Sequence, residues 1–382
     1  MFNKFKLGDI CEIVSGTTPN TSCSKYWNGD INWITPAELS DDTIIINESV
    51  RKITRQAVID TGLKSFPPGT VILSSRAPIG KVAIAGREMY CNQGFKNLIC
   101  SERINNIYLY WFLKRNTQYL NSLGRGATFK EISKSIVSDI QISLPLIEEQ
   151  IKRAENLRKC WNVIILRKRE LCKLDDLIKA RFVEMFGDIK SNSKKWEQVY
   201  LKDISYLISG GTPSRAKPEY FEGEIPWIST VALGKTEIGF EDAIEYITKD
   251  AIENSATKLI PANSLLFGIR VGVGKVSKNV VPMCTNQDIV SITNIDDNFN
   301  LVFLKYLLDE YLDFFNGQKR GATIQGIKSE TLKNILVPKV NLKLQNDFEQ
   351  FVNQVDKSKL EVQQSLDKTQ ELFDSLMQKY FG

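Results

Sequence analysis

The side chains that could act on a ligand are basic, amide and hydroxyl groups placed in turns. Two arginine–lysine pairs flank glycine turns, and each pair is followed by an Asn-Gln dipeptide. The planar fork of arginine matches a phosphate or a guanine edge, and side-chain amides match adenine. A solvated strand end and simple strand capping are the plainer alternatives for these two patterns. The residues are Arg76 and Lys81 with Asn92 and Gln93, then Arg270 and Lys275 with Asn286 and Gln287.

Two turns rich in hydroxyls and backbone N–H groups precede these residues. They read Ser-Gly-Thr-Thr-Pro from Ser15 and Ser-Gly-Gly-Thr-Pro from Ser209. Such turns can hold a phosphate, and the alternative is a plain tight turn. The residues that follow differ, which suits two readers of two different sequences built on one frame. The nucleic-acid candidates here are Thr17, Thr18 and Lys25 in the first copy, and Thr212, Ser214, Arg215 and Lys217 in the second.

Further basic and aromatic residues have two interpretations each. Arg125, and Lys319 with Arg320, stand beside glycine in loops that suit contact with phosphates. The basic residues between 152 and 169 form either a solvated helix face or a surface for phosphates or a partner. Trp33 and Trp227 follow alternating apolar positions, so we predict that they belong to the core and do not stack on bases.

The sequence lacks the groups of most catalytic sites. It contains no histidine, which removes the commonest general base and the commonest metal ligand. Gly80-Lys81 and Gly274-Lys275 fail the phosphate-loop pattern, because the earlier glycine and the following Ser or Thr are missing. No Asp-Pro-Pro or Asn-Pro-Pro run of an amino-methyltransferase occurs, and no Glu-x-Lys nuclease pair. We therefore predict no catalytic residue and no metal site.

Length and composition bound the class of protein. The 382 residues suggest two or three domains, and 42% hydrophobic with 25% charged residues is typical of a soluble globular chain. The net charge of +5 permits nucleic-acid binding without arguing for it. No apolar run approaches the roughly 20 residues of a membrane span, and the start lacks a signal peptide's apolar core. The 7 cysteines include no CxxC pair and read as reduced thiols, so we expect a cytoplasmic protein without membrane contact.

The first half of the chain returns in the second half at a nearly constant spacing. Ser15 returns as Ser209, Trp33 as Trp227 and Arg76 as Arg270, and one inserted residue precedes the return of Arg125 as Arg320. A shared offset held this long indicates internal duplication. The period is too long for a solenoid, so each copy is a domain followed by a helix.

Two long segments, 147–185 and 344–380, contain no glycine or proline and keep one face apolar. In the second, positions from Phe348 to Tyr380 step by four and three, the heptad seam of a helix packed along another helix. Each would run roughly 55 Å. The alternative, two ordinary core helices, fits poorly because such helices average about 11–12 residues. The apolar face of the first segment is Ile147, Ile151, Ala154, Leu157, Trp161, Ile164, Leu171, Leu174, Ile178, Phe182 and Met185.

These patterns predict an α/β (α+β) fold with a pseudo-two-fold internal repeat. Globular domains at 1–145 and 190–340 are each followed by a long helix, at 146–189 and 341–382, and the two helices pair as an antiparallel coiled coil. Within the domains we expect strands at 71–73, 82–85 and 265–267. We expect short amphipathic helices at 109–120 and 303–315.

The chain resembles the specificity subunits of type I restriction–modification systems over essentially its whole length. The resemblance is carried by the duplicated Ser-Gly-x-Thr-Pro and Ile-x-Trp-Ile turns. It is also carried by the run from Gly126-Ala127-Thr128 through Leu144-Pro145 to Glu148-Glu149-Gln150. The second copy keeps Gln345 but replaces the paired glutamates.

The resemblance implies a function as well as a fold. Each globular part would be a target recognition domain, and the helices would be a spacer, so that the chain reads the two halves of a split double-stranded DNA site. It would be non-catalytic and would recruit two methyltransferase subunits and, with them, restriction (translocase) subunits. S-adenosylmethionine would belong to the methyltransferase partner, and ATP with Mg to the restriction partner, so this chain itself would bind no cofactor.

Two other classes of function remain open from the sequence alone. A stand-alone enzyme acting on nucleic acid would methylate DNA without added subunits. A repeat-built structural protein would use its helices only for oligomerisation and would show no sequence selectivity with its partner present.

Overall fold

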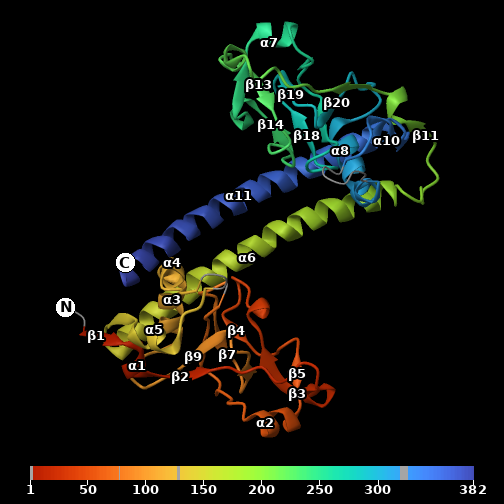
Figure 1. The fold of residues 1–382 in the computed structure, drawn as a ribbon. Coiled ribbons are helices and arrows are strands. Elements are labelled where there is room, and N and C mark those ends of the chain that lie inside the picture. The colour runs from red at the N-terminus through yellow and green to blue at the C-terminus, as the bar shows by residue number, and fades with distance from the viewer. Residues whose placement is uncertain (1–2, 77, 127–129, 319–325) are drawn as a thin grey trace. The chain divides into compact units, whose positions relative to one another are not determined.

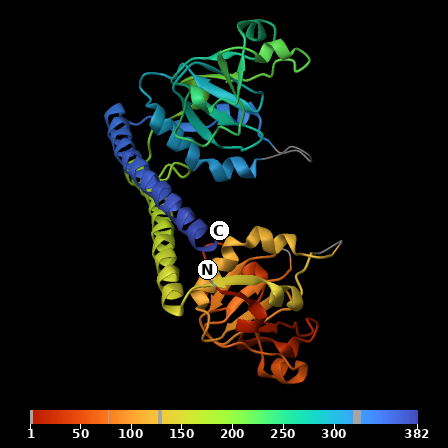
Figure 2. The same ribbon diagram turned by 90° about the vertical axis from the view of Figure 1, so that its left-hand side faces the viewer.

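The computed structural model describes residues 3–76, 78–126, 130–318 and 326–382. The chain forms two compact units (Figures 1 and 2). Unit 1 consists of Met1–Glu170 and Val362–Gly382, and unit 2 of Leu171–Glu361. The division falls inside both long helices, so each unit contains one globular part and a segment of each helix.

The globular part of unit 1 is built on two sheets. One has the strand order β2-β9-β6-β7-β4 and the other β5-β3-β8, while β1 pairs with β10. The strands are β1 Asn3–Lys6, β2 Cys11–Ser15, β3 Trp27–Ile34, β4 Ile45–Ile46, β5 Lys52–Ile53, β6 Val71–Ser74, β7 Val82–Ala85, β8 Tyr90–Cys91, β9 Phe95–Cys100 and β10 Gln141–Leu144. The helices are α1 Leu7–Ile10, α2 Arg55–Thr61, α3 Asn106–Arg115, α4 Thr117–Ser122 and α5 Lys134–Asp139, with 3₁₀ turns at Ser24–Tyr26 and Pro36–Glu38.

Unit 2 has the same topology with one additional strand, β16, in its second sheet. Its sheets have the orders β12-β20-β17-β18-β14 and β15-β13-β19-β16, and β11 pairs with β21. The strands are β11 Gln198–Tyr200, β12 Tyr206–Ser209, β13 Ile225–Ile228, β14 Glu237–Ile238, β15 Glu245–Ile247, β16 Leu259–Ile260, β17 Leu265–Gly268, β18 Val276–Asn279, β19 Met283–Thr285, β20 Ile289–Thr293 and β21 Leu336–Pro338. The helices are α7 Lys249–Glu253, α8 Leu301–Glu310, α9 Leu312–Gly317 and α10 Ser329–Lys333, with 3₁₀ turns at Leu201–Asp203, Pro218–Phe221 and Phe240–Asp242. The long helices are α6 Ile147–Phe186 and α11 Leu342–Phe381.

The two glycine–lysine pairs are tight turns between neighbouring strands. Gly80 N–H donates to the Ser74 carbonyl at 3.1 Å, and Gly274 N–H donates to the Gly268 carbonyl at 3.0 Å. Both glycines have positive φ, 93° and 85°, which side chains rarely tolerate. These positions therefore need glycine for the backbone turn itself.

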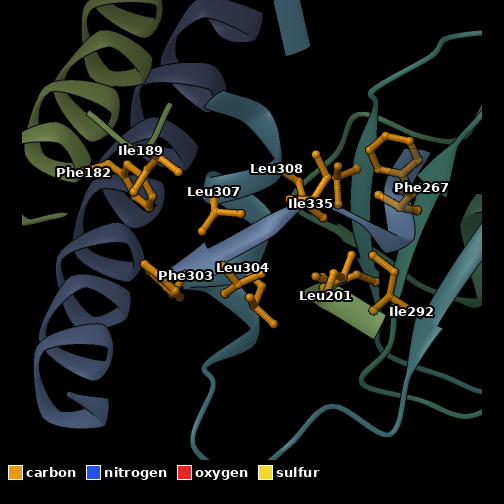
Figure 3. Close-up of a cluster of buried hydrophobic side chains, with 14 of the residues drawn as sticks. Phe182, Ile189, Leu201, Phe267, Ile292, Phe303, Leu304, Leu307, Leu308 and Ile335 are labelled. Carbon is orange, nitrogen blue, oxygen red and sulfur yellow. The ribbon is translucent and has the colours of Figure 1, made fainter. Parts of the chain in front are cut away.

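The central strands are buried on both faces, because helices cover the sheets. Every residue of β6, β7, β17 and β20 is buried. In unit 2 one apolar core runs from α6 through α8 to the sheet, as Figure 3 shows for Phe182, Phe303, Leu307 and Phe267. Burying each such side chain contributes about 1.5–3 kcal/mol. Trp33 and Trp227, exposed by only 2% and 6%, are confirmed as core residues.

In unit 1 the first part of α6 packs against the last part of α11. The Trp161 and Phe373 rings lie 5.4 Å apart, and the Arg153 guanidinium lies 5.0 Å from the Tyr380 ring. From the first contact to the second, the residue numbers fall along α6 and rise along α11, so the two helices run antiparallel.

Unit 2 shows the same direction at the other ends of both helices. The Phe182 and Phe348 rings lie 5.4 Å apart, and Lys359 forms an ion pair with Asp175 at 2.7 Å. The predicted fold class is confirmed in each of its parts. The heptad seam of α11 is buried at Phe348, Val352, Val355, Val362, Leu366 and Phe373.

The predicted apolar face of α6 is wrong at its first two positions. Ile147 and Ile151 are exposed by 39% and 43%. The cause is the end of the partner helix, because Tyr380, one residue before the last of α11, already lies beside Arg153. Only Phe381 follows Tyr380 in α11, and its ring packs on Tyr108 of α3.

A buried glutamine joins the start of each long helix to its own domain. The Gln150 side chain accepts from Asn105 N–H at 2.9 Å and donates to the carbonyls of Pro145 at 3.0 Å and Arg103 at 3.1 Å. Gln150 and Gln345 are exposed by 1% and 0%. In the second copy, Gln345 bonds in the same way to Asn300 at 2.8 Å, Val340 at 2.7 Å and Asn298 at 3.0 Å.

The end of each long helix packs on the domain of the other repeat. Phe381 of α11 contacts Tyr108 of α3, with ring centroids 4.9 Å apart. Phe186 of α6 contacts Phe303 of α8 at 4.8 Å. Each closing phenylalanine thus packs on the globular part of the unit in which its helix ends.

The two predicted amphipathic helices are each divided in two. Asn116 separates α3 from α4, and Tyr311 separates α8 from α9. Asn116 has φ −94° and ψ 18°, and its side-chain amide donates to the Phe112 carbonyl at 2.8 Å. The Phe112 carbonyl also accepts a hydrogen bond from the Asn116 backbone N–H at 3.1 Å. These local bonds close the first helix at Asn116, and the apolar periodicity does not reveal them.

The buried glutamines are testable by substitution. Gln345→Met keeps the volume but leaves the Asn300 N–H and the Val340 carbonyl without their partner. We expect the free energy of unfolding of unit 2 to fall by about 2–4 kcal/mol. The control is Gln354→Met on the exposed face of the same helix, which should change it by less than about 0.5 kcal/mol. Equal urea midpoints for the two variants would contradict the assignment.

Candidate nucleic-acid interface

In unit 1 the hydroxyl-rich turn is bonded to the Asn-Gln loop. Thr17 N–H donates to the Cys91 carbonyl at 2.9 Å, and the Thr18 hydroxyl donates to the Gln93 side chain. The Trp33 indole N–H donates to the Thr17 carbonyl at 3.1 Å. The core tryptophan therefore fixes the turn from below, and the glutamine fixes it from the side.

Three more loops continue this row. Ser75 N–H donates to the Gly94 carbonyl at 2.7 Å, and Ile132 N–H donates to the Ser75 carbonyl at 2.9 Å. Arg125 and Glu131 exchange two backbone hydrogen bonds of 3.0 and 2.9 Å. Predicted site residues from four separate stretches thus lie side by side. We call residues 16–19, 75–76, 92–94, 125 and 131–132 loop row 1.

Unit 2 contains the same row. Gly211 N–H donates to the Thr285 carbonyl at 2.9 Å, the Thr212 hydroxyl to the Gln287 side chain, and the Trp227 indole to the Gly211 carbonyl at 3.0 Å. Backbone bonds of 2.8 Å then join residue 269 to 288 and residue 327 to 269. Loop row 2 is residues 210–213, 269–270, 286–288 and 326–327.

The first glycine of each turn allows this close approach. A Cβ on Gly16 would lie 2.0 Å from the Asn92 carbonyl oxygen, and one on Gly210 would lie 2.1 Å from that of Asn286. No side chain fits there without moving the backbone. The repeated Ser-Gly motif is therefore required by the packing of two loops.

The amides predicted to read bases have structural partners. The Asn92 side-chain oxygen accepts from Gly94 N–H at 2.9 Å, and that of Asn286 accepts from Asp288 N–H at 3.2 Å. Gln93 and Gln287 are exposed but hold the two threonines. Contact of these amides with nucleic acid stays a prediction.

Arg76 belongs to a charge cluster in loop row 1. Its Nε donates to Glu131 at 2.8 Å, and the buried Lys96 ammonium lies 3.3 Å from the other Glu131 oxygen and from the Ser75 hydroxyl. Partial burial raises the pKa of Glu131, but the hydrogen bonds from Arg76 and Lys96 and their charges outweigh it and lower that pKa below its ordinary value. Glu131 therefore stays ionised and fixes the direction of the Arg76 fork.

The same arginine in loop row 2 has a different acid. Arg270 lies 3.5 Å from Asp288, on the neighbouring loop. The lysines also differ, because the Lys81 ammonium donates to the Leu39 carbonyl at 2.7 Å whereas Lys275 is exposed. Of the two lysines, only Lys275 therefore presents an exposed ammonium that none of the described residues binds.

The basic residues after the turns are held at the domain surface. The Arg215 guanidinium forms a two-point ion pair with Glu245, including one bond of 2.8 Å, and this raises the pKa of Arg215 and lowers that of Glu245. Lys25 lies 3.2 Å from Asp60, and Lys217 donates to the Tyr220 hydroxyl at 2.8 Å. Ser214 is exposed in the same loop as Arg215. Lys319 and Arg320 lie outside the described residues.

Sequence reasoning missed the acids that accompany these arginines. Glu131, Asp288 and Glu245 occupy unrelated positions in the two copies, so the repeat gave no signal for them. Lys96 was missed because it lies within a buried strand, where a charge is unexpected without a partner. The run Lys130-Glu131, close to Arg125 in the sequence, is the one local sign that an acid accompanies these arginines.

Among the described residues no group of His, Cys, Asp or Glu side chains is arranged to hold a metal ion. No helix in the described ranges has the length and apolar character needed to cross a bilayer.

Comparison with known proteins gives one consistent family. The pattern of the type I restriction modification DNA specificity domain matches residues 1–175 and again 193–371. The type I restriction enzyme MjaIX specificity subunit of Methanocaldococcus jannaschii is 31% identical, over 91% of this chain and 87% of that protein. The EcoR124I/EcoR124II specificity subunit of Escherichia coli is 31% identical over 44% of this chain and 41% of that protein.

Solved structures share the fold. The S subunit of a type I restriction–modification system from M. genitalium superposes with a TM-score of 0.61 at 15% identity, covering 100% of this chain and 96% of that one. A chain from a study of complex assembly and conformational transition of the type I R-M system gives 0.61 at 18% identity, covering 100% and 97%. At this identity the likeness establishes architecture alone.

The charge cluster predicts a pH-dependent contribution to stability. Glu131→Gln removes both ion pairs and leaves the buried Lys96 without its acid, so stability at pH 7 should fall by about 1–3 kcal/mol. The folded pKa of Glu131 lies below the unfolded one, so its contribution is complete above about pH 5.5 and is lost as pH falls through the folded pKa. Urea unfolding of both proteins across pH 3–8 measures this.

The matched control is Glu102→Gln, at an exposed carboxylate that pairs with none of the described residues. Its effect should stay below about 0.5 kcal/mol at every pH. A Glu131→Gln difference that persists unchanged at pH 3 would refute the ion-pair explanation.

Proposed function

This chain belongs to the family of type I restriction–modification DNA specificity subunits, and from that premise we propose that its two domains each read one half of a bipartite double-stranded DNA site. As a specificity subunit it is a non-catalytic component of its system. Loop row 1 would contact one half-site and loop row 2 the other.

One observation carries this proposal. The same hydrogen-bonded frame occurs twice, with Thr18 on Gln93 and Thr212 on Gln287, yet the side chains that it presents differ. A repeated frame with different outer chemistry is what two readers of unlike sequences require, because backbone positioning is general and side-chain edges specify bases. Arg76 and Arg270 offer forks for guanine edges or phosphates, and Arg125 offers a charge for phosphates.

The long helices would set the spacing of the two half-sites. Each has 40 residues and hence a length of about 60 Å. A continuous apolar seam resists sliding, because a shift by less than a heptad takes apolar side chains out of the interface. The pair therefore suits a ruler for the unread gap.

The remaining parts of the system would come from partners. We propose that the chain recruits two methyltransferase subunits, which bind S-adenosylmethionine, and restriction or translocase subunits, which bind ATP and Mg. The chain itself would need no cofactor. Its place of action would be the cytoplasm, where the host DNA and these subunits meet.

Methylome sequencing tests the bipartite site. A host that expresses this chain with its methyltransferase partners should carry methylated adenines in two defined half-sites separated by a constant gap. A variant with Arg270 of loop row 2 replaced by alanine should change or lose one half-site only. Loss of both half-sites in a correctly folded variant, or a continuous site, would refute the assignment of one half to each domain.

Shortening both helices tests the ruler. Removal of one heptad from each at facing positions, 164–170 and 364–370, keeps the seam in register and shortens the helices by about 10 Å. At about 34 Å per helical turn of DNA, the gap should shrink by about 3 base pairs. Removal of a heptad from α6 alone, the control, makes the two helices unequal in length, so their end contacts with the domains can no longer all form and methylation should be abolished. Methylation mapping that returns the original gap would overturn this role.

A further inference from the structure

In unit 1 an arginine that was not among the sequence-predicted site residues lies over two tryptophans. The Arg51 guanidinium carbon is 3.8 Å from the centroid of the Trp27 ring and 5.3 Å from that of Trp33. The two rings meet edge to face, with centroids 5.1 Å apart. Among the described residues no acid and no hydrogen-bond acceptor binds the Arg51 side chain. Its donors are therefore unused while its position is fixed.

The backbone below this side chain is held firmly. Trp33 N–H donates to the Ser49 hydroxyl at 2.9 Å and to the Arg51 carbonyl at 3.4 Å. Val50 N–H donates to the Glu38 carboxylate at 2.6 Å, and the other oxygen of Glu38 caps a 3₁₀ turn. A segment bonded in this way presents Arg51 with little freedom left to lose on binding.

Unit 2 has an aromatic pair at the equivalent positions, but the arginine that lies over it comes from a different loop. The Arg215 guanidinium lies 4.2 Å from the Phe221 ring and 5.4 Å from that of Trp227. In the strand pairing, Glu245 stands opposite Trp227, the position that Arg51 holds beside Trp33. That glutamate occupies the Arg215 fork with two hydrogen bonds.

We propose that Arg51 is a DNA-contacting residue of the first domain, and that its guanidinium takes a two-point acceptor on DNA, a guanine edge or a phosphate. Arg215 of the second domain makes no such contact, because its fork is already filled by Glu245. This inference rests on the proposed function, and it separates the two domains by how their aromatic-stacked arginines are used.

The chemistry favours this division. A guanidinium stacked on an indole gains cation–π attraction at its face and keeps its N–H donors free in the plane. Guanine O6 with N7, or two phosphate oxygens, match that edge with two parallel hydrogen bonds. To bind DNA, the Arg215 guanidinium would first have to release the Glu245 carboxylate, which is an equally good acceptor. The exchange would therefore add little to the affinity for DNA.

A neighbouring side chain supports a contact surface here. Val50 is 86% exposed, and Ile244, at the equivalent place before Glu245, is 80% exposed. Single exposed aliphatic residues are ordinary, but these two recur at matching positions of the repeat. An aliphatic side chain beside a stacked arginine fits the thymine methyl or sugar surface next to the arginine's acceptor.

The test uses the full chain in complex with its methyltransferase partners. The probe is a duplex that carries the site mapped by methylome sequencing, together with duplexes substituted at each base pair of each half-site. Arg51→Met keeps an apolar stem on Trp27 and removes only the donors. Arg215→Met is the matched control in the other domain, and thermal melting of both variants establishes that they fold.

Arg51→Met should weaken binding of the mapped site roughly 5- to 150-fold. If the acceptor is guanine, the variant loses discrimination at one base pair of a single half-site, and Arg51→Lys does not restore it. If the acceptor is a phosphate, binding of all duplexes falls alike, the salt dependence weakens by about one ion, and Arg51→Lys restores it. Arg215→Met should stay within about twofold of the wild type.

Arg51→Met binding within about twofold of the wild type, with the same salt dependence, would overturn the proposal. A loss as large for Arg215→Met as for Arg51→Met would overturn the division between the domains. Failure of the proposed function looks different, because the wild-type complex would then not distinguish the mapped duplex from the substituted ones. If Arg51→Met lowers the melting temperature sharply, the Arg51→Lys variant is used in its place. Its affinity and its salt dependence then distinguish a guanine acceptor from a phosphate acceptor.

Discussion

Each globular domain is held by the start of its own long helix and by the end of the other one. Gln150 bonds α6 to the first domain, while Phe381 brings the end of α11 onto Tyr108 of that domain. The second domain has the same pair of anchors, in Gln345 and Phe186. Because each glutamine is buried, water cannot replace its hydrogen bonds if they are lost. The phenylalanine adds the burial of apolar surface. Each domain therefore holds a segment of both long helices.

Buried polar groups also fix the turns of the two loop rows. Trp33 and Trp227 lie in the core, yet each uses its indole N–H to hold the turn above it. The backbone of the turn is thus fixed by a residue that packing already fixes. Side chains beyond this frame are then free to differ without loss of fold, because they contribute little to the core. This separation allows one architecture to present two chemistries.

The sequence allowed prediction of the features whose partners occupy equivalent positions in both copies. Trp33, Gln93 and Gln150 form hydrogen bonds that recur at one spacing in the second copy, and they reveal the duplication. The acids beside the arginines could not be predicted in this way, since Arg76 takes Glu131 whereas Arg270 takes Asp288. Helix breaks were also hidden, because neither break interrupts the apolar pattern. Exposure at the start of α6 follows from where α11 ends, a property of tertiary register that periodicity alone does not contain.

Acids beside the arginines change what a basic surface can do. An exposed ion pair contributes only about 0–1 kcal/mol to stability, so exchanging a carboxylate for a DNA acceptor costs little at the site itself. Each carboxylate nevertheless repels the phosphates of any duplex, and this lowers the sequence-independent attraction on which non-specific binding depends. The chain carries a net charge of only +5 over 382 residues. A surface with neutralised arginines and a modest net charge gains affinity chiefly where hydrogen-bond geometry is matched, and that is the condition under which side-chain edges decide which sequence is bound.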